Sequence, residues 1–256
     1  AHLRPDVSGL GQGFERVAWP SRSERPVTET LGQVLGWLEH AAPARLFLWV
    51  HVFDAHMPYE APAPYDRMYY EGPPDPFDPA LPEPAWSKSP PGNLAGLRVP
   101  AFGVAQYAAQ VSWLDHELGR LLDHPALADA TVALVGDHGE SLGAHDIWFL
   151  HDGLYPDTLH VPLLLSWPGG AAGAVRDDPV SHLDLGRTLL DLAGLDDAAF
   201  PGRSLTTPRP GPRFGLAAHG SEASLTVDGS HLVLRLVGRG DERPAHGLEL
   251  YDVRRD

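Results

Sequence analysis

Apolar residues recur at helical spacing in three stretches of the chain. They form one-sided stripes over residues 27–41, 104–122 and 183–192, and this spacing predicts three amphipathic helices. Pro43 closes the first stretch, and Gly194 follows the third at a position typical of a helix cap. Each helix therefore offers an apolar face that can cover a sheet.

Three shorter runs have a different pattern. Residues 45–53, 131–135 and 163–167 are almost continuously apolar, which is typical of strands buried on both faces. Helix and strand patterns alternate along the chain, and this succession is typical of α/β proteins. The predicted fold class is therefore α/β, with a mainly parallel sheet and helices on both of its faces.

Beyond residue 208 the pattern changes, and apolar and polar residues alternate. Residues 225–227 and 231–236 flank Asp228 and Gly229, a pair typical of a β-hairpin turn. We expect a main α/β domain over residues 1–207 and a small antiparallel subdomain over residues 208–256. Residues 72–100 contain nine prolines, so we predict neither helix nor strand there. This stretch is either a lid over a site or, in the favoured interpretation, a surface insertion.

Composition excludes several classes of protein. The formal net charge of −15 and the single lysine, Lys88, argue against a nucleic-acid partner. The absence of Cys excludes disulfides, thiolate metal sites and thiol nucleophiles. No apolar run reaches about eighteen residues, so we expect no transmembrane segment. The first residues lack the pattern of a signal peptide, which leaves export open.

Chemistry-bearing residues follow two of the predicted strands. Asp137 and His138 come directly after residues 131–135, and His56 follows residues 45–53. Open α/β sheets bind ligands at the carboxyl ends of their strands. A carboxylate beside an imidazole suits a divalent cation, and Gly139 and Gly143 allow the backbone to turn close to a bound group. The alternative interpretation is a solvated loop of caps and turns.

Two motifs carry a family resemblance. They are His-x-Phe-Asp-x-His-x-Pro-Tyr at 51–59 and Gly-Asp-His-Gly-Glu-Ser-Leu-Gly-x-His at 136–145. Further matching blocks lie at 154–164, 184–194, 202–205 and 249–252. In this order and spacing, they resemble the sulfatase family of the alkaline-phosphatase superfamily from about residue 14 to the end. The resemblance implies an α/β domain followed by a small antiparallel sheet.

The resemblance also implies roles for individual residues. Asp137 and His138 would be half of a metal site that usually holds Ca²⁺; a histidine where relatives have an amide leaves Mg²⁺, Mn²⁺ and Zn²⁺ open. His56 matches the histidine that contacts the sulfate group and assists proton transfer. His151 is the cation-capable group nearest to the position of a family lysine, and His145 is the alternative.

Other polar residues near the motifs have weaker claims to a role. His51 lies within an apolar run, so we expect a core residue rather than a ligand. Glu140, Asp146 and Asp152 are expected to be loop acids or supporting partners. We expect Asp137, His138, His56 and His151 to converge at one end of the sheet.

One family feature is missing from the sequence. Sulfatases carry Cys-x-Pro-x-Arg or Ser-x-Pro-x-Arg, whose first residue becomes the formylglycine nucleophile, and neither motif occurs here. We therefore interpret the chain as a fragment of a sulfatase, a sulfuric ester hydrolase acting on small-molecule or glycan sulfate esters. The family favours a periplasmic or secreted location. The alternatives are a phosphoryl hydrolase or transferase, of phosphodiesterase or phosphonate monoester hydrolase type, and a non-catalytic binding protein.

Overall fold

The chain divides into two compact units, residues 1–128 and 129–256, which are described separately. A computed structural model describes residues 8–20, 24–40, 45–86, 90, 92–195, 197–207, 212–216, 221–236, 247–253 and 255. None of the helices in these ranges is long and apolar enough to cross a membrane.

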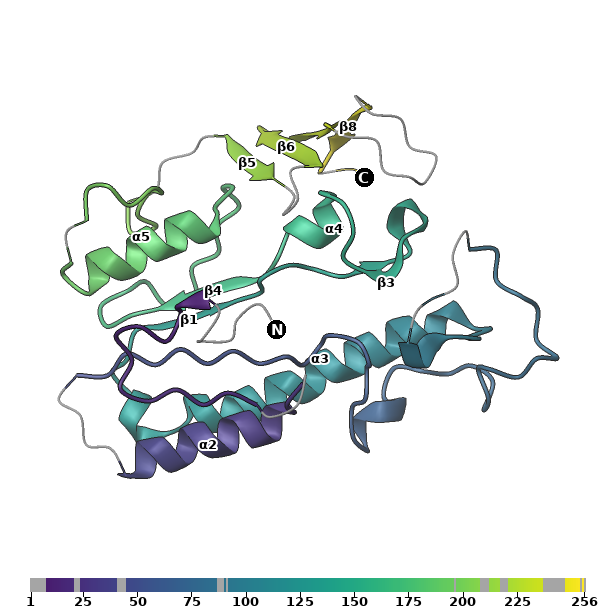
Figure 1. Cartoon of the computed structure of the whole chain (residues 1–256), viewed down its shortest axis with the longest axis horizontal. Coiled ribbons are helices and arrows are strands. Elements are labelled where there is room, and N and C mark those ends of the chain that lie inside the picture. The colour runs from purple at the N-terminus through teal and green to yellow at the C-terminus, as the bar shows by residue number, and fades with distance from the viewer. Residues whose placement is uncertain are drawn as a thin grey trace. The chain divides into compact units, whose positions relative to one another are not determined.

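Two helices form the core of the first unit (Figure 1). Helix α2 (Val27–His40) buries Val27, Leu31, Val34 and Leu38 against Leu121 of helix α3 (Pro100–Leu122). The two predicted helices are therefore confirmed. Helix α3 begins four residues earlier than expected, with Pro100 in its first turn, where proline costs no hydrogen bond. Short 3₁₀ turns occur at Tyr65–Arg67, Gly92–Leu94 and Pro125–Leu127.

The strand predicted over residues 45–53 does not form. Residues 46–53 carry no strand pairing, because the described part of the first unit contains no other strand to pair with them. Alternate residues nevertheless face different ways. Leu48, Val50 and Val52 pack against the helix core, whereas Phe47 is 73% exposed. His51 is likewise exposed, so its expected place in the core is wrong.

In the proline-rich stretch, residues 72–86, 90 and 92–99, which the structure describes, are irregular as predicted, apart from the 3₁₀ turn at Gly92–Leu94; Pro100 already belongs to α3. The backbone of the stretch is organised by carboxylates: Asp75 accepts from the N–H of Phe77, and Asp78 accepts from the N–H of Ala80. Leu94 and Leu97 are buried and anchor its end. Whether it acts as a lid or as a surface insertion stays a prediction.

The second unit begins with two paired strands. Strand β1 (Val132–Val135) pairs with β4 (Leu163–Ser166), with Val132 opposite Ser166 and Val135 opposite Leu163. This pair is antiparallel, because β4 starts where β1 ends. All described strand pairs are antiparallel, so the predicted parallel ladders are not among them. Leu134 is 37% exposed, which also corrects the expectation that β1 is buried.

Between β1 and β4 lies the segment that holds most of the candidate site. It contains a bulged hairpin of β2 (Ser141–Leu142) and β3 (Trp148–Leu150), the 3₁₀ turn η4 (Ala144–Asp146) and helix α4 (Pro156–Leu159). The sequence pattern did not predict these elements, since two to four residues are too few to show a repeated apolar period.

Helix α5 (His182–Leu192) follows β4 and confirms the third predicted helix. Ser181 and Asp184 form a reciprocal capping box at its start, and Gly194 takes a left-handed conformation, with φ of 70°, after its end. Asp184 also accepts from the N–H of Arg203, which ties the helix to the 202–205 block.

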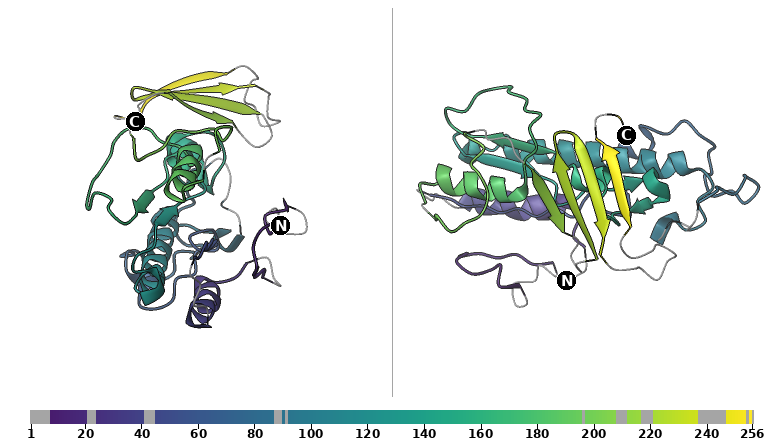
Figure 2. Two further views of the ribbon diagram at one scale, coloured as in Figure 1. Left: turned by 90° about the vertical axis from the view of Figure 1, so that its left-hand side faces the viewer. Right: turned by 90° about the horizontal axis from the view of Figure 1, so that it is seen from above.

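The carboxyl-terminal part forms a four-stranded antiparallel sheet, β5 (Arg213–Leu216), β6 (Glu222–Val227), β7 (Ser230–Arg235) and β8 (Leu248–Asp252), in that order (Figure 2). The predicted hairpin is confirmed: Asp228 and Gly229, with φ of 49° and 85°, join β6 to β7. The predicted domain boundary after residue 207 stays a prediction, since residues 208–211 lie outside the described ranges.

Candidate active site

Asp137 and His138 lie at the carboxyl end of β1, as predicted. The carboxylate of Asp137 accepts from the backbone N–H of His138 at 3.0 Å. His138 Nδ1 donates to the carbonyl oxygen of Gly139 at 3.0 Å, because a carbonyl can only accept. In the neutral ring, Nε2 is then the basic nitrogen, and it lies 3.8 Å from Asp137 Oδ2.

This geometry suits a shared cation. Metal–ligand distances of about 2.0–2.6 Å allow two ligands of one ion to lie about 4 Å apart. A metal-binding histidine typically donates its other N–H to a carbonyl group, as His138 does toward Gly139. The Asp137 side chain is 72% exposed and therefore accessible to an ion. Within the described ranges, however, no group of three or more His, Asp or Glu residues forms a complete metal site.

His151 joins this pair. Its ring lies 4.2 Å from the ring of His138, centroid to centroid, with 30° between the planes. The hairpin between β2 and β3 brings the two imidazoles together, although they are thirteen residues apart in the sequence. Three of the four predicted site residues therefore lie in one cluster of the second unit.

His56, the fourth, belongs to the first unit. Its Nδ1 donates to the carbonyl oxygen of Met57 at 2.6 Å, and its ring packs on Phe53 with centroids 4.4 Å apart. These contacts fix the ring and leave Nε2 as the basic nitrogen of the neutral form. The convergence of His56 with Asp137 stays a prediction.

Asp54, in the same motif as His56, has a perturbed ionisation. Burial raises the pKa of its carboxyl above the reference value of 3.8, although hydrogen bonds from the N–H of Val27 and from Gln110 oppose the shift. Gln110 Nε2 donates to Asp54 Oδ1 at 3.1 Å. Asp54 therefore links the motif to the start of α2 and to α3.

Sequence reasoning missed His182. This residue opens α5, and its Nε2 donates to the carbonyl oxygen of Gly136 at 2.8 Å, immediately before Asp137. No sequence signal linked it to the site, because the two residues lie 46 positions apart. His182 fixes the backbone that carries the candidate metal ligand.

Gly139 and Gly143 have a different role from the expected one. A Cβ atom on Gly139 would lie 2.1 Å from the carbonyl oxygen of Asp157, and one on Gly143 would lie 2.6 Å from the ring of Trp148. Both glycines therefore allow close packing against the protein itself. Asp157 is further held by a hydrogen bond from the Ser141 hydroxyl.

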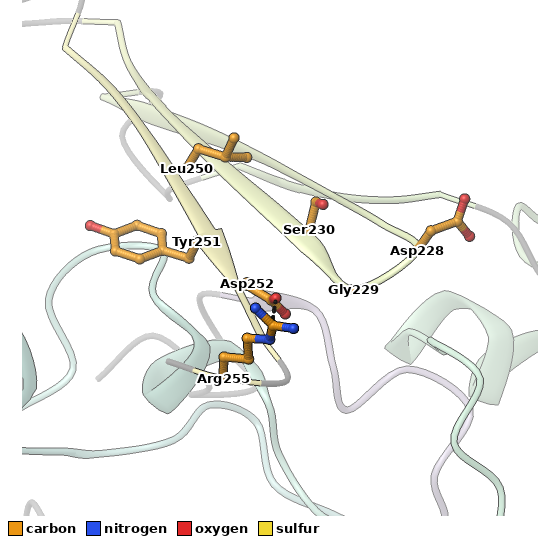
Figure 3. A pocket seen from close by; sticks show the side chains of 7 residues that line it. All are labelled: Asp228, Gly229, Ser230, Leu250, Tyr251, Asp252 and Arg255. Atoms are coloured by element: carbon orange, nitrogen blue, oxygen red, sulfur yellow. Dashed lines mark ion pairs between the residues drawn. The ribbon is translucent and has the colours of Figure 1, made fainter.

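The second unit also has an open hollow beside the β6–β7 turn, lined by Asp228, Ser230, Tyr251, Asp252 and Arg255 among others (Figure 3). An ion pair of 3.5 Å joins Arg255 to Asp252 within it. None of the four predicted site residues lines this hollow, so it is not the candidate active site.

Comparisons with known proteins agree with the motifs. The sulfatase family model matches residues 14–195. Among curated proteins, choline-sulfatase of Rhizobium meliloti is 37% identical over 93 residues, which are 35% of this chain and 18% of that protein. Human iduronate 2-sulfatase is 43% identical over 70 residues, covering 26% of this chain and 12% of that protein. The alignments thus span less than a fifth of either relative.

A solved structure supports the fold. Phosphonate monoester hydrolase of Agrobacterium radiobacter superposes with a TM-score of 0.65 at 21% identity, covering 91% of this chain and 56% of that one. This likeness confirms the predicted α/β fold class and, at this identity, shows the fold alone. The family model spans well over half of the chain and includes both histidine-rich motifs, and on this ground the chain belongs to the sulfatase family.

Proposed function

We propose that the protein hydrolyses sulfate monoesters with the help of a divalent cation. The observation that carries this proposal is the cluster of Asp137, His138 and His151 at the carboxyl end of β1, in a chain of the sulfatase family. The Asp137 carboxylate and His138 Nε2 would hold the cation. A bound cation supplies positive charge that stabilises the sulfate oxygens in the transition state.

The other two histidines have complementary tasks in this proposal. His56 Nε2 holds or releases a proton at the ester oxygen, with its ring fixed through Nδ1 by Met57. His151 donates an N–H to a sulfate oxygen from beside His138.

The proposed substrates are small-molecule or glycan sulfate esters. The names of the relatives, choline-sulfatase and iduronate 2-sulfatase, support both classes. Ca²⁺ is the proposed ion, and Mg²⁺ and Mn²⁺ are alternatives that suit the same ligands. We further propose a periplasmic or secreted location, as the family favours.

We also propose that these 256 residues alone do not turn over sulfate esters. The chain has no Cys and no Ser-x-Pro-x-Arg motif, so it lacks a residue that could become the formylglycine nucleophile. The proposed activity therefore concerns a full-length protein in which that nucleophile is present.

The test is release of a phenol from an aryl sulfate and from the matching aryl phosphate by the full-length protein. We expect sulfate turnover that a chelator abolishes and added Ca²⁺ restores. Asp137→Asn should lower the turnover strongly, whereas Asp228→Asn, in the β6–β7 hairpin turn, should leave it unchanged. A wide preference for the phosphate would instead favour a phosphoryl or phosphonate hydrolase, the activity named for the structural neighbour.

A further inference from the structure

The carboxyl-terminal sheet turns its polar face inward. Residues that are paired across the strands point to the same face of the sheet. One face carries the polar residues Glu222, Ser224, Thr226, His231, Arg235, Glu249 and Tyr251, together with the apolar Val233. Glu222 and His231 on this face are 1% and 2% exposed, whereas Leu250 on the opposite face is 69% exposed. A sheet normally buries its apolar face. Several of these buried polar groups, His231 among them, have specific hydrogen-bond partners, whereas the buried carboxylate oxygens of Glu222 have none in the described part of the chain.

One set of partners is the turn that follows His151. His231 Nε2 donates to the carbonyl oxygen of Leu154 at 2.6 Å, while its Nδ1 accepts from the Thr226 hydroxyl at 2.8 Å. Arg235 Nη2 donates to the Tyr155 hydroxyl at 3.1 Å. Strand β7 thus holds the turn at two consecutive residues.

Arg235 is itself held between two carboxylates. It donates to Glu249, and its Nε lies 3.6 Å from Glu222 Oε1. A planar guanidinium can contact three groups at once in fixed directions, which a lysine ammonium cannot do. Tyr251 donates its hydroxyl hydrogen to Glu249. Burial, and then this hydrogen bond, raise the pKa of Tyr251, so it remains a neutral donor at physiological pH. The network therefore fixes both tyrosines.

These two tyrosines bracket His145. The ring of Tyr155 stacks on the imidazole with centroids 3.9 Å apart and 15° between the planes, and Tyr251 meets it edge-on at 5.1 Å. His145 is exposed and has a left-handed backbone, with φ of 54°. Such a conformation is costly for a residue other than glycine and persists only when neighbours hold it. The imidazole is therefore displayed to solvent in a fixed plane.

We propose that His145 contacts the substrate of the candidate active site and that Tyr155, held by Arg235 and Glu249, is its positioning residue. The substrate contact rests on the proposed function. His145 lies on the loop between His138 and His151, whose rings already meet. An imidazole N–H donates to an ester or hydroxyl oxygen of the substrate, and the carboxyl-terminal sheet acts on the site through Tyr155.

The positioning role can be tested on the 256-residue chain by NMR with ¹³C-labelled histidine. Comparison with His145→Gln identifies the His145 ring signals. In the wild type these protons lie over the face of Tyr155, so they resonate upfield. Tyr155→Leu should remove the upfield shift, whereas Tyr155→Phe and Arg235→Lys should each reduce it, because both disturb the hydrogen bond between Arg235 and the Tyr155 hydroxyl.

A matched control is Tyr107→Leu, which removes another tyrosine from an edge-on contact, 5.6 Å from the ring of Tyr59. This variant should leave the His145 signals in place. His145 signals that are the same in wild type and Tyr155→Leu would overturn the positioning role.

The substrate contact is tested by kinetics of the full-length protein with an aryl sulfate. His145→Gln and Tyr155→Leu should each raise KM about tenfold, as expected for the loss of one hydrogen bond, with a smaller change in kcat. Tyr155→Phe, which keeps the ring but loses the hydroxyl held by Arg235, should raise KM less than Tyr155→Leu does. An unchanged KM in His145→Gln would overturn the contact. Absence of any sulfatase turnover would overturn the proposed function and the contact with it, while the NMR result still decides the positioning role.

Discussion

At the scale of single residues, steric contacts explain part of the strand-end motif. Gly139 approaches the backbone of α4: its N–H donates to Thr158 O at 2.8 Å, and a Cβ there would lie 2.1 Å from the carbonyl oxygen of Asp157. The glycine thus allows the Asp137 loop to lie directly against the helix. From the sequence we expected Gly139 to let the backbone approach a bound group. The contact with the helix could not be foreseen, because it involves a residue eighteen positions away.

Gly139→Ala should therefore destabilise the protein by about 1–3 kcal/mol, the usual cost of an added methyl group in a tightly packed site. The control is Gly36→Ala in the interior of α2, where a Cβ would have no neighbour within 4 Å. That change should stabilise the protein by about 0.5–1 kcal/mol, because alanine favours a helix more than glycine does. Urea unfolding of the 256-residue chain measures both, and a neutral Gly139→Ala would contradict the packing argument.

Asp54 gives a prediction about pH. Burial raises the pKa of its carboxyl in the folded state above the reference value of 3.8. The unfolded state therefore ionises first, and stability falls as pH rises from about that reference value through the folded pKa. Asp54→Asn has no ionisable carboxyl and therefore removes this loss of stability with rising pH. Its side-chain oxygen can still accept the hydrogen bond from Gln110. Its melting temperature should exceed that of the wild type at pH 7, and the difference should narrow as the pH falls toward 4.

The control for Asp54 is Asp115→Asn on the exposed face of α3. This change of an exposed side chain should leave the melting temperature at pH 7 close to that of the wild type. A destabilised Asp54→Asn at pH 7 would show that the hydrogen bonds to the carboxylate outweigh its burial.

At the scale of elements, the sequence predicted what one segment can determine by itself. The helices α2, α3 and α5 and the β6–β7 hairpin each follow from a local apolar period and a local cap or turn. Residues 46–53 have the composition of a strand, but strand formation also needs a partner, and the described residues of their unit form no strand that could pair with them. The direction of β4 likewise depends on where α4 returns the chain, and no period in the sequence encodes that.

The residues of the candidate site likewise fall into those with a local sequence signal and those without one. Asp137, His138 and His151 were predicted because each stands in or beside a motif, and the structure brings them together. His182 and Tyr155 reach this region only through tertiary contacts, from α5 and from the turn held by β7. Supporting residues of this kind leave no local pattern in the sequence.

Thr188 shows how α5 holds the 202–205 block. Its buried hydroxyl donates to Asp184 O at 2.6 Å and accepts from the N–H of Leu205 at 2.8 Å. Thr188→Val keeps the shape but leaves that N–H without its acceptor, which should cost about 1–3 kcal/mol of unfolding free energy. Thr188→Ser keeps both hydrogen bonds and should cost less. Equal losses in the two variants would attribute the effect to packing instead.

At the scale of the whole molecule, the proposed function requires residues from both units. The family match runs from residue 14 to residue 195, so it begins in the first unit and ends in the second. His56 belongs to the first unit, whereas Asp137, His138 and His151 belong to the second. Hydrolysis by the proposed route requires the proton-transfer group and the cation to act on the same ester.

A double-mutant cycle on the full-length protein tests whether His56 and Asp137 act on the same ester. His56→Ala should lower kcat/KM for an aryl sulfate by a factor of about 10²–10⁴, the usual contribution of one positioned acid-base group. Asp137→Ala should cause a loss of similar size by weakening the cation site. If both groups act on one transition state, the double variant should be little worse than the more damaged single variant, because each loss already removes the concerted step.

The matched control for this cycle is His40→Ala. His40 ends α2 in the same unit as His56, and its Nδ1 donates only locally, to Gly36 O at 2.8 Å. Combined with Asp137→Ala, His40→Ala should leave kcat/KM at the value of Asp137→Ala alone. Strict multiplication of the His56 and Asp137 effects would mean that the two groups act independently. In that case Asp137 and His56 would not share a site, and the predicted convergence of the two motifs would be wrong.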